Sequence, residues 1–463
     1  MSQTRREKDF LGEVEVPADA YFGVQTWRAV QNFPISGLRA PAVFNRAMAE
    51  IKKAAALTHG DIGALPRDVA DAIARAADEM IQGKLDAHVV VDVFQAGAGT
   101  SYHMNVNEVL ANRAGEFLGG QRGKYDRVHP NDHVNMGQST NDVFPTAMRL
   151  AALLSLPELL QELRALAEAT LAKSDEFVRV VKSGRTHLQD AVPVTLGQEL
   201  GAYAHAVRRA ANHVEEQMEP LCHLGIGGSA AGTGLNTAEG YREAVIAHLS
   251  KQTGLELVAS SNLFEAMQSM AAFVRVSSTL RAAAIELGRI SNDLRLMASG
   301  PTSGLAEIHL PAVQPGSSIM PGKVNPVVPE CMNMICFQVI GNDTCIAWAA
   351  GAGQLELNVM MPVINYDLLW SIQILTSGVR MLRTCCIEGL TADHARCADY
   401  LARTLGLATV LNPVIGYHRA AEVAREAAAT GKTIRQVVLE KRIMSEKELD
   451  TLLERSLGRT EEE

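Results

Sequence analysis

The sequence predicts an all-α protein. Only 5 % of its 463 residues are aromatic, and alanine and leucine abound, a composition that favours helices over sheets. Residues 262–299 contain no proline and a single glycine. Apolar residues recur there at alternating three- and four-residue steps, which predicts a long helix packed at a shallow angle against others. The residues of this seam are Phe273, Val276, Leu280, Ala283, Leu287, Ile290, Leu294 and Met297.

Helical patterns separated by polar turns fill most of the remaining chain. Residues 1–40 carry mixed signals and predict an irregular arm, and Pro157 predicts a break in the helix around it. After Gly389 the helices become shorter and more charged. A length prior suggests roughly three domains, which we place at 1–138, 139–392 and 393–463. We expect the main helices at 41–59, 66–81, 104–119, 143–174, 262–299, 329–350 and 363–387.

Composition excludes several classes of protein. The net charge of −9 and the lack of a dense Lys/Arg stripe argue against nucleic acid as a partner. The seven cysteines have no regular spacing, so they predict reduced thiols in a cytoplasmic protein. Residues 1–10 lack the apolar core of a secretory signal, and no uninterrupted apolar stretch reaches membrane-spanning length. No metal-ligand spacing is present, so we expect no bound metal. Because no apolar stretch is long enough to span a membrane, we also expect no membrane partner.

Residues 316–326 form the most informative polar segment, with the sequence Gly-Ser-Ser-Ile-Met-Pro-Gly-Lys-Val-Asn-Pro. The hydroxyls of Ser317 and Ser318, free backbone N–H groups and the Lys323 ammonium can together bind one anion. This segment is not a phosphate-binding P-loop, which has four residues between its glycines and Ser or Thr after its lysine. Here five residues separate Gly316 from Gly322, and Val324 follows Lys323. The alternative is an ordinary turn between helices.

Three other polar clusters carry candidate binding groups. Thr100 ends a Gly-rich turn, residues 138–142 read Gln-Ser-Thr-Asn-Asp, and Thr186 precedes His187 between two helical patterns. Each has a structural alternative: Ser139 or Asn141 can simply cap the next helix, and a single histidine is often structural. A helix N-terminus also favours anions, so capping and substrate binding are both compatible with these residues.

The segment 316–326 resembles the signature Gly-Ser-Ser-x-Met-x-x-Lys-x-Asn of the aspartase/fumarase superfamily, and the similarity extends over essentially the whole chain. The resemblance implies an all-α, three-domain subunit in a homotetramer built on a 20-helix bundle. It also implies active sites shared between subunits, a small dicarboxylate or amino-acid substrate and no cofactor. Members of the superfamily also serve as non-catalytic structural proteins, so a structural role is a further hypothesis.

The residues within this resemblance favour elimination of ammonia from L-aspartate to give fumarate. Thr140, the stretch 188–193 and the stretch 325–330 are similar to the ammonia-lyase branch. Residues 32–37 and 129–132 are instead similar to class II fumarases, so reversible hydration of fumarate to L-malate is the alternative. In that branch a secondary anion site would involve Arg127, His129, Asn131 and Asp132.

The resemblance also assigns roles to single residues. Ser317 would be the general base, with Lys323 and His187 as the other catalytic residues and Glu330 as the partner of His187. Lys323, Asn325, Thr186 and His187 would hold the α-carboxylate, and Asn141 would face the amine. The β-carboxylate would be bound by Thr100, Ser139, Thr140, Ser318, Ile319 and Met320. One position departs from the family, because His103 stands where an asparagine is usual.

Overall fold

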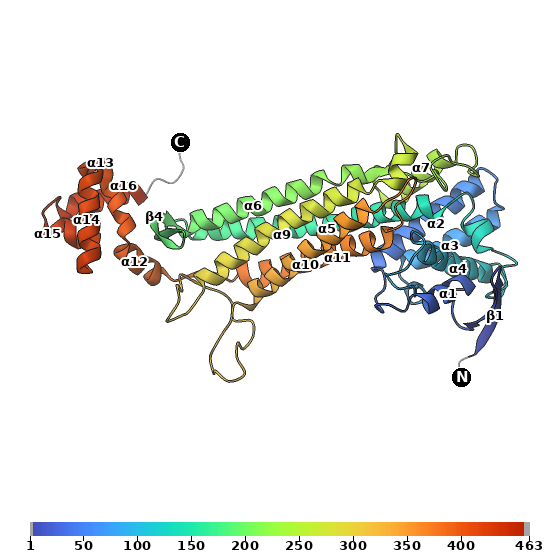
Figure 1. Ribbon diagram of the computed structural model, residues 1–463, viewed down its shortest axis with the longest axis horizontal. Helices are drawn as coiled ribbons and strands as arrows, with labels where there is room; N and C mark the ends of the chain where they lie inside the picture. Colours follow the sequence, from blue (N-terminus) through green and yellow to red (C-terminus); the bar gives the residue numbers. More distant parts are fainter. Residues whose placement is uncertain (1–2, 458–463) are drawn as a thin grey trace. The chain divides into compact units, whose positions relative to one another are not determined.

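The computed structural model describes residues 3–457 and confirms the all-α prediction (Figure 1). Short helical turns η1–η5 lie at Asp86–His88, Pro130–Val134, Glu219–Cys222, Arg383–Ile387 and Leu405–Leu407. The helices are α1 (Val24–Asn32), α2 (Ala42–Asp61), α3 (Arg67–Ile81), α4 (Thr100–Phe117), α5 (Thr140–Glu176), α6 (Leu196–Glu216), α7 (Tyr241–Thr253), α8 (Leu263–Gln268), α9 (Ala271–Met297), α10 (Val327–Gly351), α11 (Met361–Leu382), α12 (His394–Arg403), α13 (Ala408–Ile415), α14 (Tyr417–Thr430), α15 (Ile434–Glu440) and α16 (Glu446–Leu457).

The strands within the described residues form two-stranded pairs only. β1 (Thr4–Asp9) and β2 (Gly12–Pro17) pair antiparallel, so the predicted irregular arm is wrong for these residues and for α1. β3 (Val181–Thr186) and β4 (Gln189–Thr195) form a second antiparallel hairpin. The remaining strands are two residues long: β5 (His223–Leu224), β6 (Val258–Ala259), β7 (Ile308–His309) and β8 (Thr391–Ala392).

Helix α5 is continuous through Pro157, so the predicted break there is wrong. A proline inside a helix removes one backbone hydrogen bond and costs about 3 kcal/mol or more. Pro157 itself is exposed, but the neighbouring Leu153, Leu156 and Leu159 are each at most 1 % exposed. Because burying one such side chain contributes roughly 1.5–3 kcal/mol, the packing of these leucines outweighs the lost bond.

The long helix predicted over 262–299 is instead two helices, α8 and α9. The Asn262 side chain caps α8 by accepting a hydrogen bond from the Glu265 N–H. Ser269 then adopts an extended conformation, and its hydroxyl accepts a bond from the Ala271 N–H at the start of α9. The predicted seam itself is confirmed, because all eight of its residues are at most 5 % exposed.

The chain divides into two compact units. One comprises Met1–Leu160, Asn212–Ala284 and Phe337–Leu375, and the other comprises Gln161–Ala211, Ile285–Cys336 and Thr376–Glu463. The predicted division into three domains stays a prediction, because the boundary between the two units runs through α5, α6, α9, α10 and α11.

In the first unit, aromatic packing joins the helices that carry one group of candidate residues. The rings of Phe44 on α2, Tyr102 on α4 and Phe144 on α5 contact one another, with centroids 4.9 Å apart for Phe44–Tyr102 and 5.0 Å apart for Phe44–Phe144. Farther along this unit, the Ser277 hydroxyl on α9 donates to the Asp343 carboxylate on α10. The three aromatic contacts fix α2, α4 and α5 around a common core.

In the second unit, polar contacts connect the long helices. The Tyr203 hydroxyl on α6 donates to Asp293 on α9 at 2.9 Å, and the Asn333 amide on α10 donates to the Gly288 carbonyl on α9. The C-terminal helices have a core of their own around Leu411, Val423 and Val437. Residues 458–463 of the predicted C-terminal domain lie outside the described residues.

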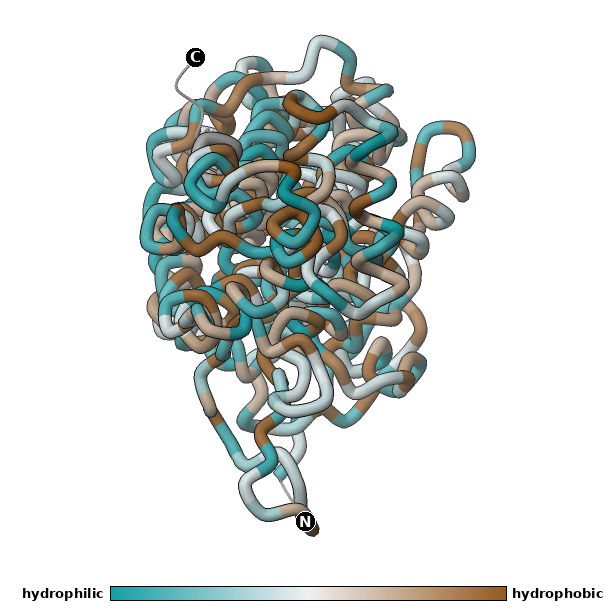
Figure 2. Tube along the Cα trace, turned by 90° about the vertical axis from the view of Figure 1, so that its left-hand side faces the viewer, coloured by the Kyte–Doolittle hydropathy of each residue, from teal (hydrophilic) through white to brown (hydrophobic). Residues whose placement is uncertain are grey.

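Within residues 3–457, one helix is long and apolar enough to cross a membrane by length and composition alone. This helix is α5, whose best 18-residue window has a mean hydropathy of 1.4. Arg149 and Glu158 interrupt the apolar residues of this helix, so the expectation that no uninterrupted apolar stretch reaches membrane-spanning length is not contradicted. In addition, 78 % of the window is buried inside the protein, as in a core helix. Figure 2 shows hydrophobic and hydrophilic segments interspersed along the chain.

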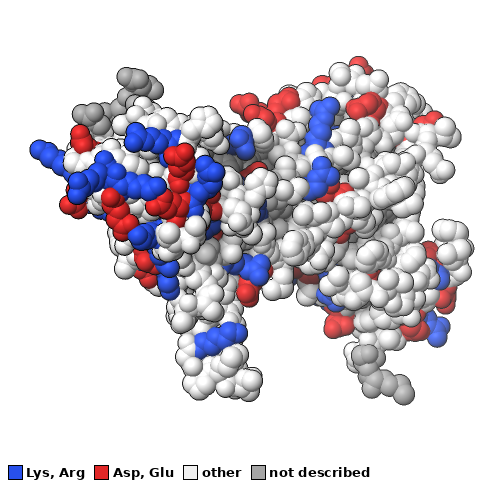
Figure 3. Space-filling view, turned by 60° about the vertical axis from the view of Figure 1, so that its left-hand side comes forward, with Lys and Arg blue, Asp and Glu red and all other residues white. Residues whose placement is uncertain are grey.

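Charged side chains of both signs are interspersed on the face drawn in Figure 3. The C-terminal helices supply several ion pairs of this kind, including Lys432 with Glu440 at 2.5 Å and Arg435 with Glu446 at 2.7 Å. Exposed pairs of this kind contribute about 0–1 kcal/mol each. They therefore keep the surface polar without forming a continuous basic stripe on this face.

Candidate active site

The loop between β7 and α10 presents its hydroxyls to solvent. Ser317 is half-buried, whereas Ser318 and Lys323 are exposed and Ile319 is 84 % exposed. The backbone N–H groups of Ile319 and Met320 donate to the Ser317 Oγ at 3.2 and 3.0 Å. Two N–H donors already point at this oxygen, so the loop is built to stabilise negative charge on it.

Hydrogen bonds close the base of this loop. The Gly316 N–H donates to the Lys323 carbonyl at 2.8 Å, and the Asn325 amide donates to the Gly316 carbonyl at 2.6 Å. A Cβ on Gly316 would lie 2.7 Å from the Lys323 carbonyl oxygen, so only glycine fits this approach. We expect this loop to close over substrate with Gly316 and Gly322 as hinges, and these bonds define the base from which it would move.

A pocket of about 400 Å³ lies beside the loop. Lys323 and Asn325 line it together with His309, Pro301 and Ile308, among others. Two of the residues that the sequence assigns to the α-carboxylate therefore line one cavity.

A second group of predicted residues lies at the N-termini of α4 and α5. The Thr100 and Thr140 hydroxyl oxygens are 3.1 Å apart. Ser139 caps α5, because its Oγ accepts from the Asn141 N–H at 3.2 Å and its own N–H donates to Asp142. The capping interpretation is therefore confirmed for Ser139. Substrate binding by the same hydroxyl stays compatible with it.

The Gly-rich turn before α4 is set by one close approach. Gly99 has φ +97°, and a Cβ there would lie 2.3 Å from the Phe144 ring. Glycine at this position lets the turn approach α5, so that Thr100 begins α4 next to Thr140. The helix begins at Thr100 rather than near Met104 as the sequence pattern suggested.

Sequence reasoning missed a buried charged group beneath these hydroxyls. Lys52 on α2 is fully buried, and its Nζ lies 2.6 Å from the Nε2 of His103 on α4. The His103 Nδ1 lies 2.8 Å from the Thr140 Oγ1. Burial and the neighbouring Lys52 charge lower the pKa of His103 well below 6.5, and burial lowers the pKa of Lys52 well below 10.5. A signal was present, because Lys52 falls on the apolar stripe of its helix with Met48, Ile51 and Ala55.

Asp142 is the buried carboxylate of this region. It accepts hydrogen bonds from the N–H groups of Ser139, Gly227 and Ser229 at 3.0–3.1 Å. Burial raises the pKa of Asp142 from 3.8 to about 6, although the three N–H donors and Lys52 act in the opposite direction. The carboxylate holds the connection from β5 to α7 against the start of α5.

The raised pKa of Asp142 predicts a pH-dependent stability difference. The folded chain binds more protons than the unfolded chain between the two pKa values, so stability is lost as the pH rises through that window. The stability of the wild type relative to Asp142→Asn should fall by about 2 kcal/mol between pH 4.5 and 8. Urea unfolding midpoints of both proteins at fixed concentration measure this. A difference that stays flat or rises with pH would contradict the assignment.

Thr186 and His187 lie at the tip of the β3–β4 hairpin, which sequence patterns did not reveal. His187 and Leu188 have φ of +54° and +58°, the conformation that a two-residue type I′ turn requires. Non-glycine residues adopt it at a cost of about 1–3 kcal/mol, and such strain is concentrated at functional sites. Both Thr186 and His187 are exposed.

A buried ion network supports this hairpin. The Glu307 carboxylate, 0 % exposed, accepts from the Arg185 guanidinium at 2.9 Å and pairs with the Lys182 ammonium at 2.9 Å. Lys182 also pairs with Glu199 at 2.8 Å. Arg185 immediately precedes Thr186, so the network holds the strand that ends in the candidate residues.

The remaining predicted residues lie elsewhere in the fold. Glu330 is in the first turn of α10. The His129 Nδ1 accepts from the N–H groups of Asn131 and Asp132 and lies 3.3 Å from the Asp132 carboxylate. Arg127, Asn131 and Asp132 are exposed. The residues of the predicted secondary anion site thus lie within residues 127–132, where the Asp132 carboxylate would oppose a bound anion.

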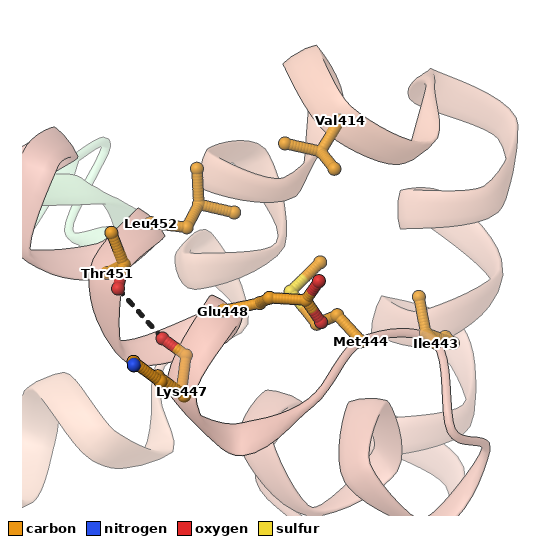
Figure 4. Close-up of a pocket in the computed structure, with 7 residues that line it drawn as sticks. All are labelled: Val414, Ile443, Met444, Lys447, Glu448, Thr451 and Leu452. Carbon is orange, nitrogen blue, oxygen red and sulfur yellow. Dashed lines mark hydrogen bonds between the residues drawn. The ribbon is translucent and has the colours of Figure 1, made fainter.

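Another pocket, of about 470 Å³, lies among the C-terminal helices (Figure 4). Its lining contains none of the predicted site residues and is largely apolar: Val414, Ile443, Met444, Lys447, Glu448, Thr451 and Leu452. Among the residues that the structure describes, no group of three or more His, Cys, Asp or Glu side chains could hold a metal ion.

Comparison with known families shows the class to which the chain belongs. The chain belongs to the lyase family, whose model matches residues 12–341, and a model described as fumarase C C-terminus matches residues 407–456.

Individual relatives cover nearly the whole chain. An aspartate ammonia-lyase from a Bacillus species is 47 % identical and covers 98 % of this chain and 97 % of its own length. One from Escherichia coli K12 is 46 % identical, covering 97 % and 94 % respectively. Two solved structures each superpose with a TM-score of 0.95. A fumarate lyase:delta crystallin from Brucella melitensis bound to cobalt is 49 % identical and covers 98 % of both chains. A class II fumarase from Schistosoma mansoni is 37 % identical and covers 99 % of this chain and 100 % of its own.

Proposed function

We propose that the chain is an aspartate ammonia-lyase, which reversibly eliminates ammonia from L-aspartate to give fumarate. The observation that carries the proposal is the arrangement of the 316–326 loop, where two backbone N–H groups point at the Ser317 Oγ. It occurs in a chain that is 46–47 % identical to several aspartate ammonia-lyases over nearly its full length.

The difficult step is removal of a proton from the carbon beside the β-carboxylate. Such a C–H is a weak acid, and the resulting dianionic enediolate forms only if preorganised donors stabilise it. Thr100, Ser139 and Thr140, at the N-termini of α4 and α5, supply hydroxyl donors and helix-terminal N–H groups for that charge. In this proposal Ser318 and the loop N–H groups complete the β-carboxylate site.

Ser317 acts as the general base. A serine hydroxyl is itself a very weak acid, so its oxyanion must be stabilised before it can take the proton. The Ile319 and Met320 N–H groups are already within 3.2 Å of the Oγ, and Lys323 supplies a positive charge on the same loop. Lys323 and Asn325, with Thr186 and His187, hold the α-carboxylate, and Asn141 faces the amine that departs.

Fumarate formation tests this function directly. Ultraviolet absorbance should show fumarate from L-aspartate and none from L-malate. Fumarate from L-malate alone would favour the second candidate, a class II fumarase. That alternative is supported by the 37 % identical fumarase and by the turn that contains His129. Formation of fumarate from neither substrate would contradict both and favour a structural role.

We propose that the protein acts as a homotetramer with active sites shared between subunits. Support comes from an uncharged exposed stripe on α10, where Phe337 is 65 % and Trp348 is 80 % exposed. Between them Gly341, Thr344 and Cys345 are also exposed at three- to four-residue spacing. Apolar stripes of this kind are typical of helix–helix interfaces. Neither nucleic acid nor membrane is a proposed partner, and the proposed location is the cytoplasm.

A charge in this stripe should break the assembly. Phe337→Glu would bury a carboxylate in an apolar interface, so the mass by light scattering should fall from that of a tetramer toward the 49.8 kDa of one chain. Fumarate formation should fall with it, because shared sites would be incomplete. Val414→Glu, at a 61 % exposed position on α13, is the control. A wild type that is itself monomeric and active would contradict the proposal.

A further inference from the structure

The Lys52 ammonium has three acceptors around it. These are the His103 Nε2 at 2.6 Å, the Asn135 Oδ1 at 3.0 Å and the Gln138 Oε1 at 2.9 Å. An ammonium has three N–H donors and no acceptor, so this environment satisfies every proton of a charged lysine. Burial lowers the pKa of Lys52 well below 10.5, and the Asp142 charge acts in the opposite direction; the three acceptors are the geometric reason for assigning the charged form.

The hydrogen bond between the Lys52 Nζ and the His103 Nε2 determines the tautomer of His103. Its Nε2 must be an acceptor, because a charged lysine can only donate to it. A protonated imidazole is excluded, because it would place two positive charges 2.6 Å apart in a buried site. The proton of the neutral ring is therefore on Nδ1, which donates to the Thr140 Oγ1 at 2.8 Å.

Donation from His103 leaves the hydroxyl proton of Thr140 available for a ligand. The Thr140 Oγ1 accepts from the His103 Nδ1 at 2.8 Å and from the Thr100 hydroxyl at 3.1 Å. The Thr100 hydroxyl has the Gly97 carbonyl, at 2.7 Å, as a second acceptor for its proton. A carboxylate has only acceptors, so it needs hydroxyls whose protons point toward it.

We propose that His103 is a positioning residue that makes Thr140 a hydrogen-bond donor to the substrate carboxylate, by donating from Nδ1 while accepting from the buried Lys52 ammonium. The inference rests on the proposed function, because it deepens the role of Thr140 in binding a dicarboxylate. It also accounts for His103 at a position where the family resemblance implies asparagine, because an asparagine amide nitrogen can donate to a hydroxyl as Nδ1 does.

The tautomer can be read without any turnover. In protein labelled with ¹⁵N-histidine, the His103 ring, identified by its loss in His103→Asn, should be neutral and protonated on Nδ1 from pH 6 to 8. Saturating succinate, an unreactive four-carbon dicarboxylate, should shift its Nδ1 signal. Protonation on Nε2 would reverse the direction of donation, with Lys52 as a neutral amine and Thr140 donating to His103, and would overturn the proposal.

Activity measurements on two variants distinguish the roles of the two ring nitrogens of His103. His103→Asn keeps a donor at the Nδ1 position, so kcat/KM for L-aspartate should stay within about threefold of the wild type. His103→Gln reaches Lys52 in place of Nε2 but leaves Thr140 without its donor, so kcat/KM should fall roughly 10- to 100-fold, mainly through kcat. Equal losses in both variants, at equal thermal midpoints, would contradict the proposal. If His103→Gln does not fold, the tautomer in the wild type still decides.

Failure of this inference is distinguishable from failure of the proposed function. No fumarate from L-aspartate with wild-type protein refutes the function alone, provided that succinate still shifts the Nδ1 signal. Normal fumarate formation with an Nε2-protonated His103 refutes the positioning role alone.

Discussion

Ser317→Ala is expected to lower kcat for L-aspartate roughly 10²- to 10⁴-fold, the usual contribution of a general base. The variant removes the only group assigned to accept the proton, while the hydroxyls on α4 and α5 and the Lys323 side chain stay in place. Binding of succinate should therefore change by less than about threefold. A fall in kcat with unchanged binding is the signature of an interaction made only in the transition state.

The matched control is Ser303→Ala, which removes an exposed serine hydroxyl from the segment before β7. It should leave kcat and KM unchanged. Solvent deuterium exchange into the carbon beside the β-carboxylate gives a second readout, because it reports proton removal separately from loss of the amine. Exchange at the wild-type rate in Ser317→Ala would show that another group is the base.

The helical class of the fold and its main seam could be predicted from sequence, because both depend on the spacing of apolar residues along the chain. The seam from Phe273 to Met297 repeats every three to four residues, and each of its members is buried. The segment 316–326 was equally accessible, since its glycines, serines and lysine are consecutive in the chain. Its internal donors, which point at Ser317, follow from the same short stretch.

The features that sequence reasoning missed depend on partners distant in the chain. His103 was singled out as a departure from its family, but Lys52 lies 51 residues away on another helix. The turn at His187 and Leu188 lacks the glycine or asparagine that usually marks a hairpin. Pro157 was interpreted as a break because the local pattern does not show how completely the neighbouring leucines are buried. In each case tertiary packing decides what local propensity leaves open.

Glu307→Ala should destabilise the fold by about 3–5 kcal/mol, the usual effect of removing one partner from a buried ion pair. Glu307 is 0 % exposed and faces two cations, Lys182 and Arg185. Without it, Arg185 loses its carboxylate partner and Lys182 keeps only Glu199. Both cations had been desolvated for a partner that is then absent, so the loss exceeds that of a single hydrogen bond.

The control is Glu286→Ala, which breaks the exposed pair with Arg289 and should cost at most about 1 kcal/mol. Urea midpoints at one protein concentration compare the two variants, and equal shifts would show that the Glu307 network does not support the fold. Activity adds a second consequence. Because Arg185 lies beside Thr186 at the end of β3, folded Glu307→Ala protein should bind succinate more weakly through a loosened hairpin, whereas Glu286→Ala should bind it normally.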